Sequence, residues 1–251
     1  MKFGVIVFPG TWSDVNCNYA LAKTIDQPVS YIWHRQTSLA GYDCVILPGL
    51  FSHGEHLRAG AMARFAPMMA EVERFARRGG LVFGICNGFQ MLCESGLLPG
   101  CLMTNNHPES CYRPVHLRVE TTSTPFTCQC QKGQVLQVPI SHRDGKYCAD
   151  EDTLRRLEDG GQIALRYCSP KGEVTEAANP DGSLHNIAGI TNKKGNVLGM
   201  MPHPERVCEE ILTAIGGAML FQSVVDWQRR AKAQIMGRCV QAPAGGAGAD
   251  R

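Results

Sequence analysis

The sequence predicts an α/β fold in which a doubly wound, mostly parallel sheet is joined to a mixed-sheet middle region. Two observations carry this prediction. Between residues 2 and 96, short apolar runs alternate with stretches of helical periodicity, which is typical of buried parallel strands connected by helices. Between residues 112 and 168, strand-like runs follow one another mostly without helices between them, which indicates a mixed sheet.

The first half opens with an apolar run at residues 2–8 that Pro9-Gly10 terminates, as expected of a buried strand. Ser13 or Asp14 can cap the next helix, because short polar side chains accept hydrogen bonds from the first helical N–H groups. Gly79-Gly80 favours a left-handed helix end. We expect further strands at residues 29–33, 44–47 and 81–85, and helices at residues 13–25, 57–78 and 88–95.

The second half is expected to hold strands at residues 112–120, 135–142, 162–168 and 197–201. Asp150 is placed to cap a short helix that ends at Glu158. A closing helix is predicted over residues 209–234, with a break near Gly216-Gly217. We expect a single domain over residues 1–236 and a flexible, Gly- and Ala-rich tail over residues 237–251.

Composition narrows the classes of function. The 251 residues carry a net charge of +2 from 25 basic and 23 acidic side chains, and the basic ones form no stripe or long run. This favours neither nucleic acid nor a membrane surface as the main partner. The sequence lacks an apolar run of the roughly 18–20 residues that a membrane span needs, so we expect a cytoplasmic protein.

The 12 cysteines then favour reduced thiols over a disulfide framework. Cys128-Gln-Cys130 is the one spacing that suggests a zinc site, but no second Cys or His pair stands at a suitable distance. We therefore expect no metal site.

Gly84-Ile85-Cys86-Asn87-Gly88 has the pattern of a nucleophile held in a sharp strand-to-helix turn, with sulfur in place of oxygen. The glycines leave room for that turn, which lifts the Cys86 thiol above the carboxyl end of the sheet. The helix N-terminus favours a thiolate, and the Asn87 N–H can stabilise an oxyanion. The alternative is a buried cysteine in a glycine-rich turn.

A nucleophilic thiol needs a base and a group that orients the base. His203 directly follows the apolar strand at residues 197–201, in Pro202-His203-Pro204-Glu205. Residues two apart in an extended chain lie on the same side, so Glu205 can accept a hydrogen bond from His203. The alternative is a rigid, proline-rich exit turn with no catalytic role.

Two motifs resemble those of class I glutamine amidotransferases, which have a flavodoxin-like sheet: residues 84–90 (Gly84 to Gln90) and residues 202–205 (Pro202 to Glu205). A closer resemblance, running from residue 2 to about 227, is to the glutaminase subunits of phosphoribosylformylglycinamidine synthase, an enzyme of purine biosynthesis. The stretches that carry it are residues 5–10, residues 57–58 with 60–61 and 63–65, residues 113–120, residues 179–180 with 182–184, and residues 186–192.

The resemblance implies a triad of Cys86, His203 and Glu205 that hydrolyses glutamine to glutamate and ammonia through a thioester on Cys86. It also implies that Gln90 helps to hold glutamine. The alternative for Gln90 is a polar helix residue that faces solvent.

The same resemblance implies two further parts of the site, a loop that stabilises an oxyanion and a histidine in the substrate pocket. The loop Pro48-Gly49-Leu50 is similar to the second oxyanion strand, in which the N–H of residue 50 is a donor beside that of Asn87. His142 resembles, more loosely, a position in the substrate pocket.

Partners are implied as well. Relatives of this kind work with a large synthetase subunit and a small accessory subunit, and the ammonia converts formylglycinamide ribonucleotide to its amidine. The sequence lacks a phosphate-binding Gly-x-x-x-x-Gly-Lys loop, so no cofactor is expected in this chain, and ATP and Mg are expected on the synthetase.

Leu50 departs from the resemblance, because similar chains carry glycine there. A left-handed backbone is costly for leucine, so a poorly formed oxyanion hole and low activity without a partner are expected. Two alternatives follow: a catalytically impaired scaffold or regulatory subunit of the same fold, or a thiol hydrolase of another substrate.

Overall fold

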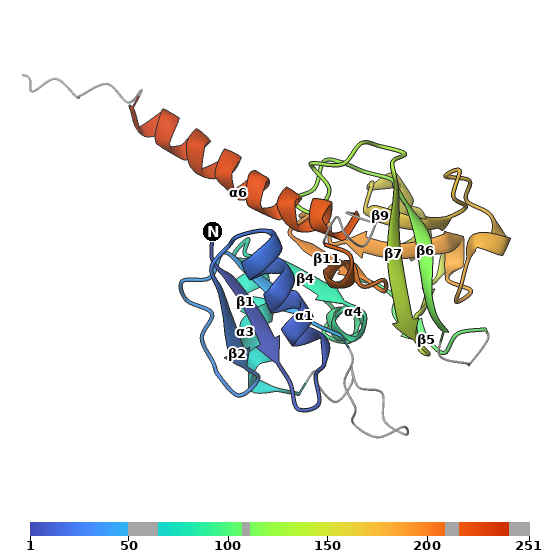
Figure 1. Cartoon of the computed structure of the whole chain (residues 1–251), viewed down its shortest axis with the longest axis horizontal. Helices are drawn as coiled ribbons and strands as arrows, with labels where there is room; N and C mark the ends of the chain where they lie inside the picture. Colours follow the sequence, from blue (N-terminus) through green and yellow to red (C-terminus); the bar gives the residue numbers. More distant parts are fainter. Residues whose placement is uncertain (50–64, 107–110, 209–215, 241–251) are drawn as a thin grey trace, which may run out of the picture.

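The computed structural model describes residues 1–49, 65–106, 111–208 and 216–240. One large sheet runs through this part of the chain, from β2 at one edge to β7 at the other, and a two-stranded ribbon of β5 and β8 lies beside it (Figure 1). The strands are β1 (Phe3–Val7), β2 (Val29–Trp33), β3 (Cys44–Leu47), β4 (Leu81–Ile85), β5 (Cys101–Met103), β6 (Cys111–Val119), β7 (Val135–His142), β8 (Lys146–Cys148), β9 (Ile163–Cys168), β10 (Ile187–Thr191) and β11 (Val197–Met200).

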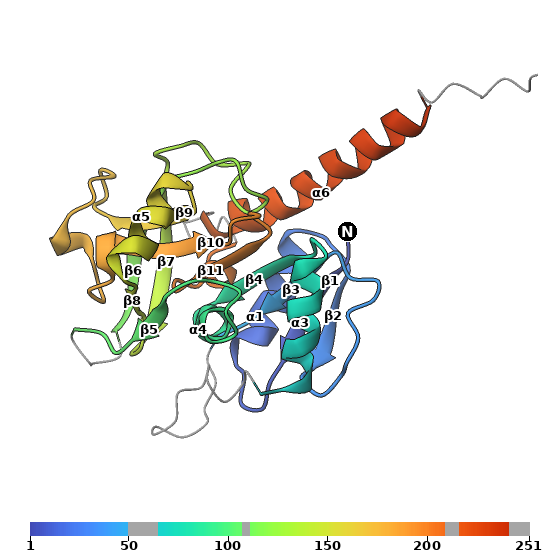
Figure 2. The ribbon, with the colours of Figure 1, turned by 180° about the vertical axis from the view of Figure 1, so that it is seen from behind.

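Helices lie on both faces of the β1–β4 part of the sheet, with α1 in front of it in Figure 1 and α3 in front of it in Figure 2. The long helix α6 extends away from the sheet in both views. The helices are α1 (Ser13–Tyr19), α3 (Pro67–Arg77), α4 (Asn87–Glu94), α5 (Glu151–Asp159) and α6 (Gly216–Val240), with the π-helix η1 (Ala20–Thr24) and the 3-10 turns η2 (Glu176–Ala178), η3 (Leu184–Asn186) and η4 (Pro204–Arg206).

The large sheet changes character at β11. Its strand order is β2-β1-β3-β4-β11-β10-β9-β6-β7. The pairs from β2 to β11 are parallel, and the pairs from β11 to β7 are antiparallel, so β11 belongs to both parts. Strands β3, β4 and β11 are buried along their whole length, which explains their continuous apolar sequences. The predicted fold class, a mostly parallel α/β sheet with a mixed region, is confirmed.

The prediction of one helix over residues 57–78 is wrong, because α3 begins at Pro67 and Ala66 has an extended backbone. A residue that precedes proline is kept out of the helical region by the proline ring, and proline itself suits the first helical position. Residues 57–64 of the predicted helix lie outside the described residues.

The closing helix also differs from its prediction. Its described part, Gly216–Val240, runs beyond the predicted end at residue 234, so the predicted start of the tail at residue 237 falls inside a helix. A side chain at Gly217 would overlap the Pro204 carbonyl oxygen, which explains a glycine at this point of close backbone approach. Residues 209–215 and 241–251 lie outside the described residues.

At the first helix, the predicted cap is wrong while the helix itself is present. Trp12 occupies the N-cap position without a side-chain hydrogen bond, and Ser13 is the first helical residue and buried. The capping prediction succeeds at α5, where the Asp150 carboxylate accepts a hydrogen bond from the Thr153 N–H at 2.7 Å. Strands β5 and β8 were not predicted, because each has only three residues, and β10 was not predicted although it is a fully buried apolar run of five residues.

The described cysteines are free thiols, and the described chain brings together no group of three or more His, Cys, Asp or Glu side chains that could hold a metal ion. Within the same residues, no helix combines the length and the apolar character needed to cross a membrane.

Replacing Gly88 by alanine is expected to destabilise the fold by about 3 kcal/mol, because the added Cβ would overlap the Leu47 carbonyl oxygen at the end of β3. Gly133→Ala is the control: this glycine has open space but a φ of +82°, so conformational strain alone should cost about 1 kcal/mol. Urea unfolding of both variants measures the difference. Equal losses would show that α4 can move away from β3 at little cost.

Candidate active site

Cys86 stands at the turn between β4 and α4, with a φ of 53° and a ψ of −108°. Such a conformation is strained for any residue but glycine, so the surrounding chain must hold it. The Cys86 N–H donates to the Met200 carbonyl at 2.8 Å, and no side chain fits at Gly84 or Gly88 without displacing backbone. The predicted sharp turn is therefore present, and it leaves the Cys86 thiol buried at the start of a helix.

His203 lies just beyond β11, and its backbone N–H donates to the Pro139 carbonyl of β7 at 2.8 Å. Its Nδ1 is 2.7 Å from Glu205 Oε1, and both side chains are fully buried. A carboxylate accepts but does not donate, so Nδ1 carries the proton and Nε2 is the nitrogen that can exchange a proton with another group.

Gly49 shows how closely the thiol and the imidazole approach. A Cβ built on Gly49 would lie 2.7 Å from Cys86 Cβ and 3.1 Å from His203 Cε1. The ends of β3, β4 and β11 therefore meet at one place, because these strands are neighbours and parallel. This is the edge at which open α/β sheets bind their ligands.

The charges around His203 favour the protonated form of its imidazole. Burial lowers the pKa of His203, but the Glu205 carboxylate and then the Cys86 thiolate raise it by more, so the pKa of His203 is raised to about 10. The imidazole is therefore protonated at neutral pH. A protonated imidazole beside Cys86 can give a proton to a group that leaves when the thiolate, the nucleophilic form of cysteine, attacks.

Asn87 and Gln90 lie on the first turns of α4, next to the thiol. The Cys86 Sγ is 3.9 Å from Asn87 Oδ1, and Asn87 Nδ2 donates to Gln90 Oε1 at 3.1 Å. Gln90 Nε2 donates to the Asp144 carbonyl at 2.6 Å. Gln90 is buried, so the alternative in which it faces solvent is wrong. The roles of Asn87 and Gln90 toward an oxyanion or a substrate stay predictions.

His142 is buried at the end of β7, where its Nε2 is 3.1 Å from Asp181 Oδ2. Tyr167 donates from its hydroxyl to the same oxygen at 3.0 Å. Asp181 and Tyr167 were not predicted, although residues 179–180 and 182–184, on either side of Asp181, belong to the family resemblance. Leu50 lies outside the described residues.

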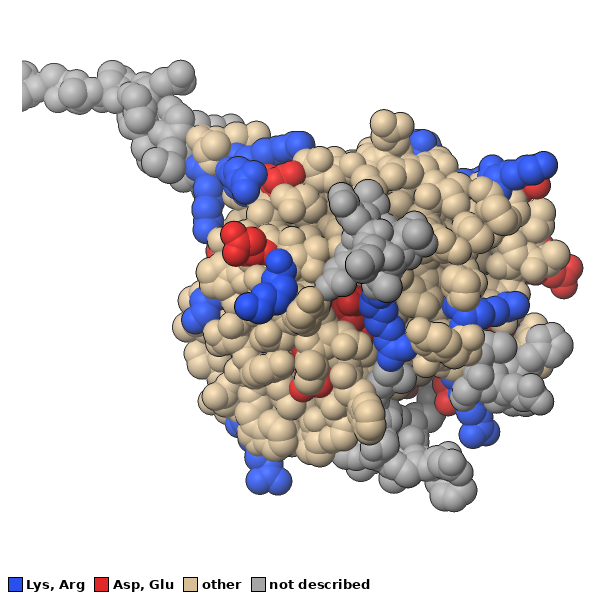
Figure 3. Space-filling view, in the orientation of Figure 1, with Lys and Arg blue, Asp and Glu red and all other residues tan. Residues whose placement is uncertain are grey.

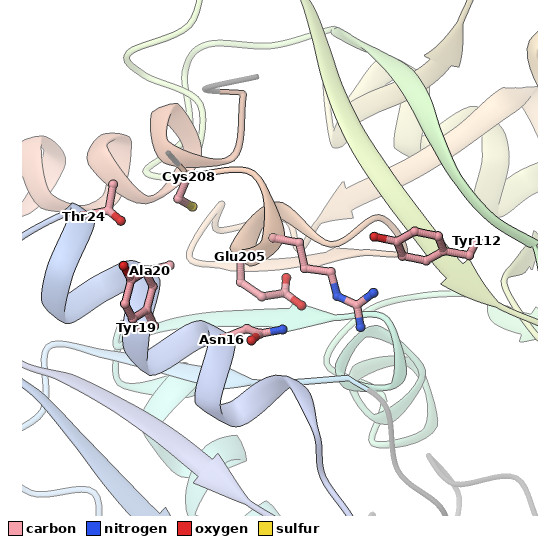
Figure 4. Close-up of a pocket in the computed structure, with 8 residues that line it drawn as sticks. Asn16, Tyr19, Ala20, Thr24, Tyr112, Glu205 and Cys208 are labelled. Atoms are coloured by element: carbon pink, nitrogen blue, oxygen red, sulfur yellow. The ribbon is translucent and has the colours of Figure 1, made fainter. Parts of the chain in front are cut away.

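A cavity of about 380 Å³ opens on the far side of Glu205, between α1 and η4. Figure 4 shows the Glu205 side chain in the middle of it, with Asn16 of α1 below and Tyr112 of β6 to one side. Neither Cys86 nor His203 lines this cavity, so the cavity does not open onto the Cys86 thiol. On the face shown in Figure 3, several Lys and Arg side chains gather at the upper left, over α6, and the others stand apart among uncharged and acidic side chains.

Replacing Glu205 by glutamine is expected to lower the pKa of His203 by about 1 to 3 pH units, because the carboxylate is the main group that raises it. A reaction that needs a protonated His203 then loses rate at lower pH than in the unchanged protein. NMR titration of the imidazole and the alkaline limb of kcat/KM measure this shift.

The matched control is Glu158→Gln, because Glu158 also lies 2.7 Å from a histidine, His185, but at the surface. It should leave both measurements unchanged. An unaltered alkaline limb in Glu205→Gln would remove His203 from the proton transfers.

The known proteins that this chain resembles are glutamine amidotransferases. Residues 1–229 match the family described as the CobB/CobQ-like glutamine amidotransferase domain. The chain is 57% identical over 230 residues to the phosphoribosylformylglycinamidine synthase subunit PurQ of Moorella thermoacetica, covering 92% of this chain and 98% of that protein. It is 51% identical over 225 residues to the subunit of the same name from Salinibacter ruber, covering 90% and 96%.

Among solved structures, the structure of PurLQS from Thermotoga maritima contains a chain that matches with a TM-score of 0.79 at 37% identity. That match covers 90% of this chain and 98% of the other. The resemblance that the motifs suggested is thereby confirmed. The chain belongs to the family of CobB/CobQ-like glutamine amidotransferases, in which its similar relatives are PurQ subunits.

Proposed function

We propose that this chain is the glutaminase subunit of a phosphoribosylformylglycinamidine synthase, with Cys86 as nucleophile, His203 as acid and base, and Glu205 as the group that orients His203. The observation that carries the proposal is the meeting of Cys86 and His203 beside Gly49, where the ends of three parallel strands converge. The high identity to PurQ subunits over almost the whole chain supports the choice of reaction.

In the first half of the proposed reaction, the Cys86 thiolate attacks the side-chain carbonyl carbon of glutamine. A carbon–sulfur bond forms and the carbonyl electrons move onto oxygen. When the intermediate collapses, the carbon–nitrogen bond breaks and the leaving nitrogen takes a proton from His203 Nε2. The products are ammonia and a thioester on Cys86.

In the second half, the now neutral His203 accepts a proton from water as the water oxygen attacks the thioester. The carbon–sulfur bond breaks, glutamate leaves, and the thiolate and the protonated imidazole are restored. Glu205 stabilises the imidazolium before and after the reaction, because its carboxylate accepts a charge-assisted hydrogen bond from Nδ1–H.

Stabilisation of the oxyanion is assigned to the backbone N–H groups of Asn87 and of residue 50. Asn87 is the first residue of α4, whose dipole favours negative charge at this end. Leu50 lies outside the described residues, so low activity without a partner stays a prediction that rests on its sequence alone.

The ammonia is proposed to pass to a large synthetase subunit, with a small accessory subunit completing the complex. A relative at 37% identity belongs to a structure named PurLQS, which supports a partnership of this kind. Ammonium is not nucleophilic, so a guarded route between subunits serves the reaction better than release into water. ATP and Mg are assigned to the synthetase, and the complex to the cytoplasm.

Replacing Cys86 by alanine should abolish glutamine-dependent synthesis in the assembled complex and leave ammonia-dependent synthesis unchanged, because only the source of ammonia is lost. The loss should exceed about 1,000-fold, as for the removal of other nucleophiles. Cys128→Ala, a cysteine on a separate loop, is the control and should retain both activities.

Each alternative has its own outcome in this experiment. Glutamine-dependent synthesis that survives Cys86→Ala would favour a scaffold or regulatory subunit. A chain that consumes no glutamine, alone or in the complex, but hydrolyses other thiol-protease substrates would favour a different thiol hydrolase.

A further inference from the structure

Two partly exposed thiols face each other across the ribbon of β5 and β8, at the left of Figure 2. Cys101 of β5 stands directly opposite Cys148 of β8 in the antiparallel register. Residues that are directly opposite point to the same face of a ribbon, and the buried pair of Leu102 and Tyr147 takes the other face. In the registers of the described strands, no other two cysteines face each other.

The spacing of the two strands at this pair suits a disulfide. The Tyr147 N–H donates to Ser183 Oγ at 2.9 Å, away from β5. Hydrogen-bonded and non-hydrogen-bonded pairs alternate along an antiparallel ladder, so Cys101 and Cys148 form a hydrogen-bonded pair with Cα atoms about 5.5 Å apart. Disulfides join Cα atoms that are roughly 4.4–6.8 Å apart. The backbones are in close contact here, because a Cβ built on Gly100 would lie 2.8 Å from the Cys148 carbonyl oxygen.

The same geometry makes such a disulfide strained. The Cβ atoms of opposite residues lie about 4.5–5.5 Å apart, whereas a disulfide holds its Cβ atoms about 3.8 Å apart. Closing the bond must therefore draw the two side chains together by roughly 1 Å. Strained and exposed disulfides are reduced more easily than structural ones. The pair thus suits a reversible link and not a permanent one.

The groups around the pair favour Cys148 over the other nearby thiol as the partner of Cys101. Burial raises the pKa of Cys148, and a thiolate at Cys101 adds to this, but the Lys146 ammonium on the same face opposes it. Burial and then Cys101 raise the pKa of Cys93 of α4 well above its ordinary value. Because the thiolate is the reactive form, Cys93 is the poorer nucleophile.

The ribbon is tied to the candidate active site through both of its strands. Strand β5 packs against α4, and β8 follows the turn whose Asp144 carbonyl accepts a hydrogen bond from Gln90 Nε2 at 2.6 Å. Asn105, just beyond β5, accepts from the Gly145 N–H of the same turn at 2.8 Å. A movement of β8 toward β5 is therefore transmitted to Gln90, one turn of α4 beyond Cys86.

We propose that Cys101 and Cys148 are a redox modification site, at which hydrogen peroxide closes a reversible disulfide that lowers the use of glutamine. The peroxide converts one thiol to a sulfenic acid and releases water. The other thiol attacks that sulfur, which forms the sulfur–sulfur bond and releases a second water. The thiols lose two electrons and two protons, which the peroxide takes up. The effect on glutamine rests on the proposed function, whereas formation of the disulfide does not.

Peptide mass spectrometry of the peroxide-treated complex tests the bond. Peptides joined through Cys101 and Cys148 should appear, and glutathione should separate them again. Cys148→Ser, which keeps the size of the side chain, should remove this cross-link, whereas Cys93→Ala should retain it. The site is wrong if no such cross-link forms, or if Cys101 is instead joined to Cys93. Resistance to glutathione would contradict a reversible link.

Glutaminase kinetics of the complex test the effect on glutamine. Oxidation should lower kcat/KM for glutamine by about 3- to 30-fold more in the unchanged complex than in the Cys148→Ser complex, because a small shift at Gln90 misplaces the substrate. Glutathione should restore this difference. Oxidation of Cys86 or of the partner subunits affects both complexes alike and cancels in the comparison.

An equal loss in both complexes would overturn the effect on glutamine. Failure of the proposed function has a different signature, because the reduced, unchanged complex would then consume no glutamine, while the cross-link between Cys101 and Cys148 would still be found.

Discussion

The parallel pairing of β4 with β11 is the constraint on which the candidate active site depends. Ile85 faces Met200 in the register of these strands, and the hydrogen bond from the Cys86 N–H to the Met200 carbonyl continues the pairing past the end of β4. A slip of this register by one residue would turn each side chain of β11 to the opposite face. The thiol and the imidazole would then no longer converge.

The strained conformation of Cys86 is held by its neighbours on every side. A side chain at Gly84 would collide with the turn at Gly88, one at Gly88 with Leu47 of β3, and one at Gly49 with the Cys86 and His203 side chains, so close packing contains the strain. The buried Glu205 carboxylate and His203 imidazole then compensate each other's charge. Removing one partner of such a pair leaves an uncompensated charge in the interior, which is why the triad and the fold depend on the same residues.

Much of the fold could be predicted because its parallel strands are continuous apolar runs with clear ends. Strands β2, β3, β4 and β7 match their predicted ranges. Cys86, His203 and Glu205 could be found because each stands in a local pattern: a glycine-flanked turn, or a proline-stiffened segment after a buried strand. These patterns are short in sequence, so neighbouring residues alone reveal them.

What could not be predicted depends on contacts between distant segments. Asp181 and Tyr167 are polar residues in ordinary sequence surroundings, and only the packing of β7, β9 and the turn at residues 179–183 brings them to His142. Strand β10 follows a 3-10 turn in which His185 and Asn186 have positive φ, and the local sequence does not reveal that turn. The early start expected for α3 is wrong because the ring of Pro67 keeps Ala66 extended, and helical periodicity in the sequence does not reveal this local effect.

The position of β11 in the chain has a consequence for biosynthesis. Strands β1 to β4 and the turn with Cys86 leave the ribosome early. The fifth parallel strand, β11, which pairs with β4, is made only near the end of translation. Until then, β4 has an unpaired edge and the thiol has no base. On the roles proposed for Cys86 and His203, a nascent polypeptide that lacks β11 cannot deaminate glutamine, and catalytic competence is acquired in one late step, together with closure of the sheet.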